Sequence, residues 1–303
     1  MKKLISIMCV ICLLINLTPV WAEETWSAEA WDQIVAALVS EDAVPVPESR
    51  RIQIKSSQVY LADPNKQGLG WMNIALISTD SPDIRHNFGR SEAVLVFRVN
   101  PLTGDFFLLS LPEYMKVSVA WCPYEMQLKY VNCFGGPLLA IDTINREFGL
   151  SVNRYCAINV NSFASIIDTF GGVPITLTEG EAEALGLDQG LQTLTGDQAV
   201  RYLKIQREWD EATHFRNLLE SLLKQMTTGG LLGAALTMID ALLSMIDTNM
   251  TLDEIVAFAF SLVGQQELKE IAAYRVETNA DGYVDEAAKQ ACRQFLYGGA
   301  AAK

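Results

Sequence analysis

The chain has 303 residues, of which 36 are acidic and 23 are basic, and its formal net charge is −13. Such an acidic surface repels the phosphates of nucleic acids, so we expect no nucleic-acid partner. Because 50% of the residues are hydrophobic, the chain can bury a sizeable core, and its length fits one large domain.

The N-terminal segment has the three parts of a secretory signal. Lys2 and Lys3 give it a positive start, Leu4–Leu17 is almost wholly apolar, and Ala22 is a small residue suited to signal-peptidase cleavage. We predict that residues 1–22 are removed and that the protein is exported, to work outside the cell or in the cell envelope. The alternative is an uncleaved segment that anchors the protein, although its apolar run of about 14 residues is shorter than the ~20 that a membrane span needs.

The rest of the chain alternates strand patterns, rich in Ile, Val and aromatic residues, with amphipathic helical patterns. The predicted strands are Arg51–Leu61, Trp71–Ser78, Ala93–Val99, Phe106–Leu111, Lys116–Trp121, Arg154–Val160, Val173–Leu177 and Leu268–Glu277. The predicted helices are Trp26–Val39, Pro137–Phe148, Asn161–Phe170, Thr195–Ile205, Asp210–Met226, Leu231–Asp247, Leu252–Val263 and Asp285–Leu296. This alternation predicts an α/β fold, in which a mixed central β-sheet is covered by helices.

Two capping boxes and the domain limits complete the predicted organisation. Thr178 with Glu181, and Thr251 with Glu254, have the spacing of residues that satisfy the first turn of a helix. We divide the chain into a signal peptide (1–22), an N-terminal helix with a linker (23–50) and a single domain (51–303).

Four cysteines remain once the signal is removed, namely Cys122, Cys133, Cys156 and Cys292. An exported protein can form disulfides, and four cysteines allow three pairings, among which the sequence does not choose. Cys122 and Cys133 are close enough in the chain to bridge a loop, but free buried thiols are an equal alternative.

Several short blocks at the ends of predicted elements carry a more specific pattern. One apolar strand ends in Asp80, and the next begins with the block Gly89–Glu92 (GRSE). Further along are Phe170–Pro174 (FGGVP) and Leu194–Tyr202 (LTGDQAVRY). In their order and spacing these blocks resemble the LytR-CpsA-Psr family of bacterial cell-envelope proteins, with the best-matching core over residues 71–225.

The resemblance implies both a fold and a chemistry. Members of the family hold a polyprenyl-phosphate lipid in an apolar tunnel within the α/β domain. They are phosphotransferases that move a glycopolymer from a polyprenyl diphosphate carrier to peptidoglycan, with Mg²⁺ at the diphosphate. The expected partners are therefore a polyprenyl (di)phosphate lipid and a cell-wall glycopolymer or peptidoglycan. Such a site gathers arginines and a metal ion because the diphosphate leaving group carries negative charge.

The family's site residues are carried over position by position. Asp80 matches the acid after the first core strand, and Glu92 stands where the family has Asp, so these two are the expected Mg²⁺ ligands. Arg90 matches the arginine of the same block, and Lys204 falls on an arginine position. Arg90 and Lys204 are therefore the expected catalytic and substrate-binding residues.

The same comparison shows departures from the family. A phosphate-binding arginine is replaced by Glu113, and a second one by Gln206. Lys204 keeps its charge but loses the bidentate geometry of arginine. Arg207 and Arg216 are the remaining candidates for substrate binding in this region.

These departures leave two hypotheses open for the function. The first is a divergent Mg²⁺-dependent glycopolymer–peptidoglycan phosphotransferase, which the retained Asp80, Arg90 and Glu92 favour. The second is a catalytically degenerate module that binds polyprenyl phosphate lipid or wall polymer, which the replacements at Glu113 and Gln206 favour.

Overall fold

The strands that were predicted around the GRSE block lie at the centre of the protein. The structure is a computed structural model, and it describes residues 46, 48, 51–67, 70–82, 87–120, 122, 124–205, 211–228, 239–263 and 269–298. All of these belong to one compact unit, Pro45–Lys303. The predicted signal peptide (1–22) and the predicted helix Trp26–Val39 lie outside the described residues.

Strand β1 has a partner on each side along almost its whole length. It pairs antiparallel with β2 and parallel with β6, and the complete sheet of the described residues has the order β10-β3-β2-β1-β6-β9. The sheet therefore contains both parallel and antiparallel pairs, which confirms the predicted mixed α/β fold. The strands are β1 (Met72–Thr79), β2 (Ser91–Asn100), β3 (Asp105–Leu111), β6 (Arg154–Asn159), β9 (Asp247–Thr248) and β10 (Ala272–Arg275).

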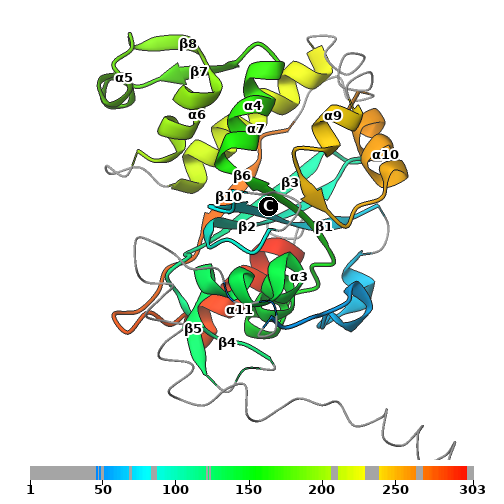
Figure 1. Ribbon diagram of the computed structural model, residues 1–303. Helices are drawn as coiled ribbons and strands as arrows, with labels where there is room; N and C mark the ends of the chain where they lie inside the picture. The colour runs from blue at the N-terminus through cyan, green and yellow to red at the C-terminus, as the bar shows by residue number, and fades with distance from the viewer. Residues whose placement is uncertain are drawn as a thin grey trace, which may run out of the picture. The chain divides into compact units, whose positions relative to one another are not determined.

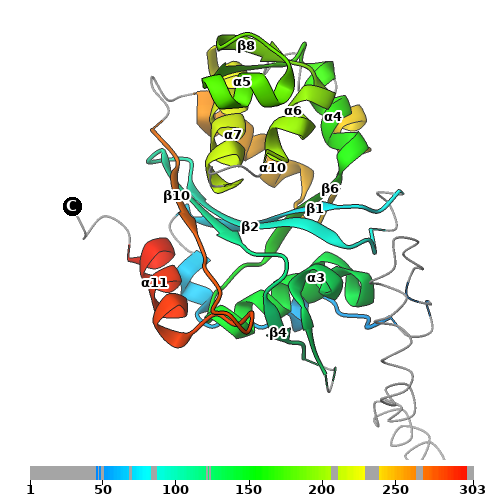
Figure 2. The same cartoon turned by 90° about the vertical axis from the view of Figure 1, so that its left-hand side faces the viewer.

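Helices cover both faces of this sheet (Figure 1, Figure 2). One face carries α3 (Leu128–Phe148) and α11 (Glu286–Tyr297), and the opposite face carries helices from the second half of the chain. These helices are α4 (Val160–Thr169), α6 (Gly196–Leu203), α7 (Glu211–Thr228), α9 (Ile239–Leu243) and α10 (Leu252–Val263). Burial on both faces explains why β2 is a nearly continuous apolar run rather than an alternating one.

Helix α3 shows how a predicted boundary can mark a kink. The sequence predicts a helix that begins at Pro137, whereas the helix begins at Leu128. Gly136 has φ 66° and ψ −167°, which is not helical, so a second helical segment starts at Pro137. The segment before the kink was missed because its glycines and asparagine are poor helix formers.

The predicted strand Arg51–Leu61 is wrong. The described backbone there includes a short 3-10 helix, η3 (Ser56–Gln58), and its polar groups bond to α3 instead of to another strand. Ile52 N donates to Phe134 O over 2.6 Å, and Tyr60 N donates to Asp142 Oδ1 over 2.7 Å. The segment is rich in β-formers, but tertiary hydrogen bonds outweigh that local preference.

Two small hairpins stand outside the central sheet. β4 (Lys116–Ser118) pairs with β5 (Glu125–Gln127), and β7 (Val173–Leu177) pairs with β8 (Gly190–Leu194). β8 was not predicted, because only one of its residues, Leu194, is buried and the strand lacks a strong apolar pattern.

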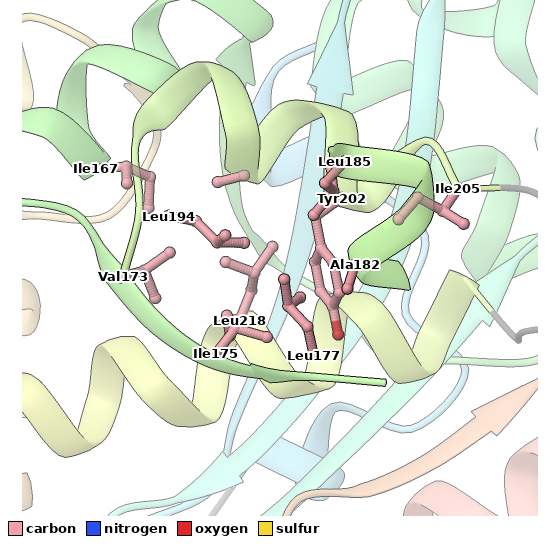
Figure 3. Packing of buried hydrophobic residues seen from close by; sticks show 11 residues of the cluster. Ile167, Val173, Ile175, Leu177, Ala182, Leu185, Leu194, Tyr202, Ile205 and Leu218 are labelled. Carbon is pink, nitrogen blue, oxygen red and sulfur yellow. The ribbon is translucent and has the colours of Figure 1, made fainter. Parts of the chain in front are cut away.

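An apolar cluster joins the β7–β8 hairpin to helices α4, α6 and α7 (Figure 3). Tyr202 of α6 and Leu218 of α7 are almost completely buried, and they face side chains from β7 and from α5 (Glu179–Leu185). Within this layer the buried His214 ring lies 3.0 Å from the carboxylate of Glu181. Both predicted capping boxes are confirmed, since Thr178 and Glu181 bond reciprocally, as do Thr251 and Glu254.

The sequence did not decide whether the four cysteines form disulfides. Cys122, Cys133, Cys156 and Cys292 are free thiols in the structure. Cys133 is buried, and burial raises the pKa of its thiol to about 12, so it does not form a thiolate near neutral pH. Among the helices formed by described residues, none is long and apolar enough to cross a membrane.

The pair of Glu181 and His214 makes a prediction about stability and pH. Burial alone would raise the pKa of Glu181, but the hydrogen bonds from Thr178 and the attraction of His214 hold that pKa below its ordinary value. The ionised carboxylate therefore stabilises the fold above about pH 4.3, and this contribution is lost as the pH falls through the lowered folded-state pKa.

We expect Glu181→Gln to lower the free energy of unfolding near neutral pH by about 1–3 kcal/mol and to weaken the acid dependence of that energy. Urea unfolding at several pH values measures both effects. Glu183→Gln, on the exposed face of the same helix, is the matched control. An equal loss in both variants would contradict the assignment.

Candidate functional site

The site predicted from the GRSE block forms where β1 ends and β2 begins. Asp80 follows β1 directly, Arg90 directly precedes β2, and the chain closes on itself between them. Asp80 N donates to Arg90 O over 3.1 Å. In return, Arg90 N and Arg90 Nε donate to the two carboxylate oxygens of Asp80, both over 2.6 Å.

This closure needs a glycine next to Arg90. A Cβ atom at Gly89 would lie 2.4 Å from the backbone nitrogen of Ser81 and 2.6 Å from Asp80 Oδ1. Any side chain would therefore push apart the two segments that the Asp80–Arg90 pair joins. The ion pair is partly open to solvent, with 31% of the Arg90 side chain and 25% of the Asp80 side chain exposed. Hydrogen bonding to Asp80 raises the pKa of Arg90, which keeps the guanidinium charged.

Helix α3 fixes the same loop from inside the protein. The buried Asn132 amide donates to Asn87 O over 2.9 Å and to Gly89 O over 2.7 Å. Thr79, the last residue of β1, donates to Asn87 Oδ1 over 2.6 Å. Sequence analysis missed Asn132, because a single asparagine inside a block of apolar and small residues gives no signal until the helix is packed against the loop.

A β-bulge places Glu92 on the site. Ser78 pairs with Ala93 and Thr79 pairs with Ser91, so Glu92 is the extra residue between them. A bulge redirects the side chain of its extra residue, and Glu92 meets Lys204, whose Nζ lies 3.6 Å from Glu92 Oε2. Lys204 follows the last residue of α6, so two distant parts of the chain meet here.

The position of Lys204 depends on close packing between α4 and α6. A Cβ at Gly196, the first residue of α6, would lie 2.1 Å from Ala164 O. Gly196 N also donates to Asp168 Oδ1 of α4 over 2.7 Å. The glycine of the LTGDQAVRY block and the aspartate before the FGGVP block thus hold α6 against α4.

The other predicted residues lie in different surroundings. Arg216 of α7 pairs with Glu270, at 3.5 Å, and not with the carboxylates of Asp80 or Glu92. Arg207 lies outside the described residues, as does Gln206. The backbone of Glu113 accepts a hydrogen bond from Lys129 N at the start of α3. Within the described part of the chain, no cationic side chain lies within 4 Å of the Glu113 carboxylate.

The two predicted Mg²⁺ ligands are already engaged by cations of the chain. Both oxygens of Asp80 accept from Arg90, and Glu92 faces Lys204. Over the described residues, no group of three or more His, Cys, Asp or Glu side chains is arranged to hold a metal ion. Mg²⁺ usually keeps several waters and takes one or two carboxylates together with substrate phosphates. Because both carboxylates here already pair with cations of the chain, a magnesium ion at this position would have to displace Arg90 or Lys204 from them.

Comparison with known proteins identifies the class of protein that has this fold and this site. The pattern of the LytR_cpsA_psr family matches residues 40–296. The chain belongs to this family, which confirms the resemblance seen in the sequence.

The chain is 25% identical over 197 residues to the polyisoprenyl-teichoic acid–peptidoglycan teichoic acid transferase TagU of Oceanobacillus iheyensis. That match covers 61% of this chain and 60% of TagU, so the chain spans about 60% of the length of this curated relative. Its fold is similar to TagV from Bacillus subtilis, with 16% identity and a TM-score of 0.60 over 75% of this chain and 97% of TagV.

A third similar protein is the LytR-CPS2A-psr family protein YwtF (TagT), whose structure holds bound octaprenyl pyrophosphate lipid. It is 15% identical, with a TM-score of 0.59 over 78% of this chain and 91% of YwtF. At these identities the two solved structures establish the fold.

The bonds of Asn132 make a prediction about the order of the site. Asn132→Ala should lower the free energy of unfolding by about 1–3 kcal/mol, because the buried carbonyl of Asn87 and the partly buried carbonyl of Gly89 lose their donor. It should also speed hydrogen exchange at the amides of Asp80 and Arg90, which the loop closure protects. NMR-detected exchange measures the second effect.

Asn145→Ala is the matched control for this variant. Asn145 is also fully buried in α3 and donates to the carbonyls of Tyr60 and Val152, away from the site. Because Asn145 Oδ1 also accepts a hydrogen bond from Val152 N, we expect a loss of stability at least as large, with unchanged exchange at Asp80 and Arg90. Equal exchange rates at Asp80 and Arg90 in the two variants would show that Asn132 does not position the loop.

Proposed function

We propose that this protein binds a polyprenyl diphosphate carrier and transfers the attached glycopolymer to peptidoglycan in the cell envelope. The observation that carries the proposal is the presence of two ion pairs, Asp80–Arg90 and Glu92–Lys204, at the start of β2 in a chain of this family. The name of its relative TagU describes transfer of teichoic acid from a polyisoprenyl carrier to peptidoglycan, and the YwtF structure holds a polyprenyl pyrophosphate.

The headgroup of such a carrier would meet two cations. The Arg90 side chain is 31% exposed and the Lys204 side chain is 60% exposed, so both can turn donors toward a phosphate without leaving the site. A guanidinium and an ammonium together offer directed, charge-assisted hydrogen bonds to phosphate oxygens. Because the protein as a whole is acidic, this local cluster supplies the attraction that the surface as a whole does not.

Transfer in this proposal is displacement at phosphorus. A hydroxyl oxygen of peptidoglycan forms a bond to the phosphorus that carries the glycopolymer, and the bond from that phosphorus to the bridging oxygen of the diphosphate breaks. The lipid leaves as polyprenyl monophosphate, and the hydroxyl proton passes to solvent. Arg90 and Lys204 stabilise the charge that develops on the leaving phosphate, which is mainly a matter of position and electrostatics.

The apolar chain of the carrier needs an apolar surface next to this headgroup. We assign it to the face of the sheet that is covered by α7 and α10. There Phe215, Leu219 and Phe258 pack against the core as incompletely buried hydrophobic side chains. Met250 belongs to the same layer and also lines a cleft of about 400 Å³ at α9 and α10, most of whose other lining residues are apolar.

The second candidate function is binding without transfer. Glu113 carries the observation that favours it, because this acid stands where the family resemblance expects a phosphate-binding arginine. A carboxylate near a diphosphate repels it, and this repulsion would weaken the stabilisation of the transition state. In this alternative the protein keeps the fold and holds the lipid or the wall polymer.

The place of action follows from the substrate. We propose that the protein is exported by residues 1–22 and acts in the cell envelope, where polyprenyl carriers and peptidoglycan meet. The support is the three-part pattern of the N-terminal segment together with the envelope function in the name of TagU.

Removal of Arg90 tests the headgroup site. We expect Arg90→Ala to weaken binding of farnesyl diphosphate at least about tenfold, a loss of ~1.4 kcal/mol, while binding of uncharged farnesol stays the same. Isothermal titration calorimetry measures both ligands. Arg154→Ala is the control, because Arg154 forms an ion pair of similar exposure with Glu254 at the other end of β6. Equal affinities of Arg90→Ala and Arg154→Ala for farnesyl diphosphate would exclude Arg90 from the headgroup site.

Reversal of the charge at position 113 separates the two candidate functions. Glu113→Arg should increase turnover of a polyprenyl diphosphate-linked oligosaccharide, because it removes repulsion and adds a phosphate donor. The assay measures the polyprenyl monophosphate that is released. If neither the wild type nor the variant releases it although both bind the lipid, binding without transfer is the function.

A further inference from the structure

Each carboxylate of the site has its own cation from the chain. Asp80 accepts two hydrogen bonds from Arg90, and Glu92 faces the ammonium of Lys204. These two acids and two bases carry formal charges that cancel. Among these four described side chains the carboxylates are therefore already balanced by cations of the chain, although the carboxylates are the groups that the family resemblance assigns to Mg²⁺.

Lys204 is well placed to act on a ligand as well as on Glu92. Its Nζ lies 3.6 Å from Glu92 Oε2, which is longer than the 2.7–2.9 Å or so of a strong charge-assisted hydrogen bond. An ammonium has three donors, so one contact of this length leaves donors for phosphate oxygens. With 60% of its side chain exposed, Lys204 can move toward a headgroup at little cost in desolvation.

Glu92 shows why an ammonium fits here. The bulge turns this side chain toward the end of α6, and the close α4–α6 contact at Gly196 brings Lys204 to meet it. The pair is thus produced by backbone features rather than by a chance meeting of flexible side chains. An ammonium beside a carboxylate supplies positive charge without the carboxylates and ordered waters that Mg²⁺ needs as ligands.

We propose that Lys204 supplies, from the chain itself, the positive charge that a divalent cation would otherwise bring to Glu92. The site then binds a diphosphate headgroup without Mg²⁺. This proposal rests on the proposed function, because it concerns the same diphosphate headgroup. It adds that the ammonium of Lys204, rather than Mg²⁺, balances the negative charge of that headgroup.

The test compares binding of farnesyl diphosphate to the full chain in EDTA and in excess Mg²⁺, by isothermal titration calorimetry. We expect the wild type to bind equally well in both buffers. Lys204→Ala should lose at least about tenfold in affinity in EDTA, or ~1.4 kcal/mol. It should recover affinity with Mg²⁺, because Glu92 is then open to the metal. Lys204→Arg should keep metal-independent binding.

Lys269→Ala is the matched control. Lys269 pairs with Asp105, and the exposures of that pair, 57% and 35%, are close to the 60% and 39% of Lys204 and Glu92. Asp105 pairs with Asn100 at the far end of β2, about 26 Å from Glu92 at a rise of ~3.3 Å per residue. We expect this variant to match the wild type in both buffers.

Three results would overturn the proposal. If the wild type binds only when Mg²⁺ is present, the proposal about Lys204 fails while the proposed function stands. If Lys204→Ala binds as well as the wild type in EDTA, Lys204 does not supply the charge. If the wild type does not bind in either buffer, the proposed function fails, and this proposal fails with it.

Discussion

The structure depends on the pairing of β1 with a partner on each side. Its last residue, Thr79, pairs with Ser91 of β2 and with Asn159 of β6. Asn159 is the N-cap of α4 and accepts a hydrogen bond from Ser162 N. The pairing of Thr79 therefore fixes where β2 begins, where β6 ends and where α4 starts, because strand hydrogen bonds leave little freedom in register.

The site follows from this arrangement by short steps. Hydrogen bonds after Thr79 hold Asp80 against Arg90, and Glu92, the extra residue of the bulge beside Thr79, pairs with Lys204. Helix α4, which starts at the same point, packs against α6 and so carries Lys204 into reach. Asp80 meets Arg90, and Glu92 meets Lys204, because the backbone brings their segments together, while the two ion pairs are partly exposed and contribute little to stability by themselves.

The negative net charge of the chain makes the local cations Arg90 and Lys204 important for binding an anionic ligand. A net charge of −13 repels anionic lipids and phosphate polymers at long range. A ligand of this kind can bind only where cations gather, and it gains further from burying an apolar chain. The apolar layer between the sheet and α7 lies on the same side of the sheet as α6, so the proposed headgroup site and the proposed site of the lipid chain share one face.

The sequence predicted the parts of this architecture that depend on local patterns. The strands near 72–79, 91–100 and 105–111, the caps at Thr178 and Thr251, and the mixed sheet are of this kind. The segment around Ile52 was assigned to a strand because its tertiary hydrogen bonds to α3 leave no trace in local composition.

The candidate site shows the same limit. Asp80, Arg90, Glu92 and Lys204 could be named from short blocks of sequence, but which carboxylate pairs with which cation could not. The bulge at Glu92 and the two bonds of Asn132 arise only when segments that are distant in the chain are packed together. The pairing of Arg216 with Glu270 depends on packing in the same way.

The measurement that tests the account most directly is a crystal structure of the full chain with farnesyl diphosphate. The account predicts diphosphate oxygens within hydrogen-bonding distance of Arg90 and Lys204, with the farnesyl chain between the sheet and α7. The contradicting result is a diphosphate bound elsewhere while Arg90 and Lys204 stay with their own carboxylates. One such place is the cleft of about 550 Å³ that Lys66 and Arg293 line beside α11.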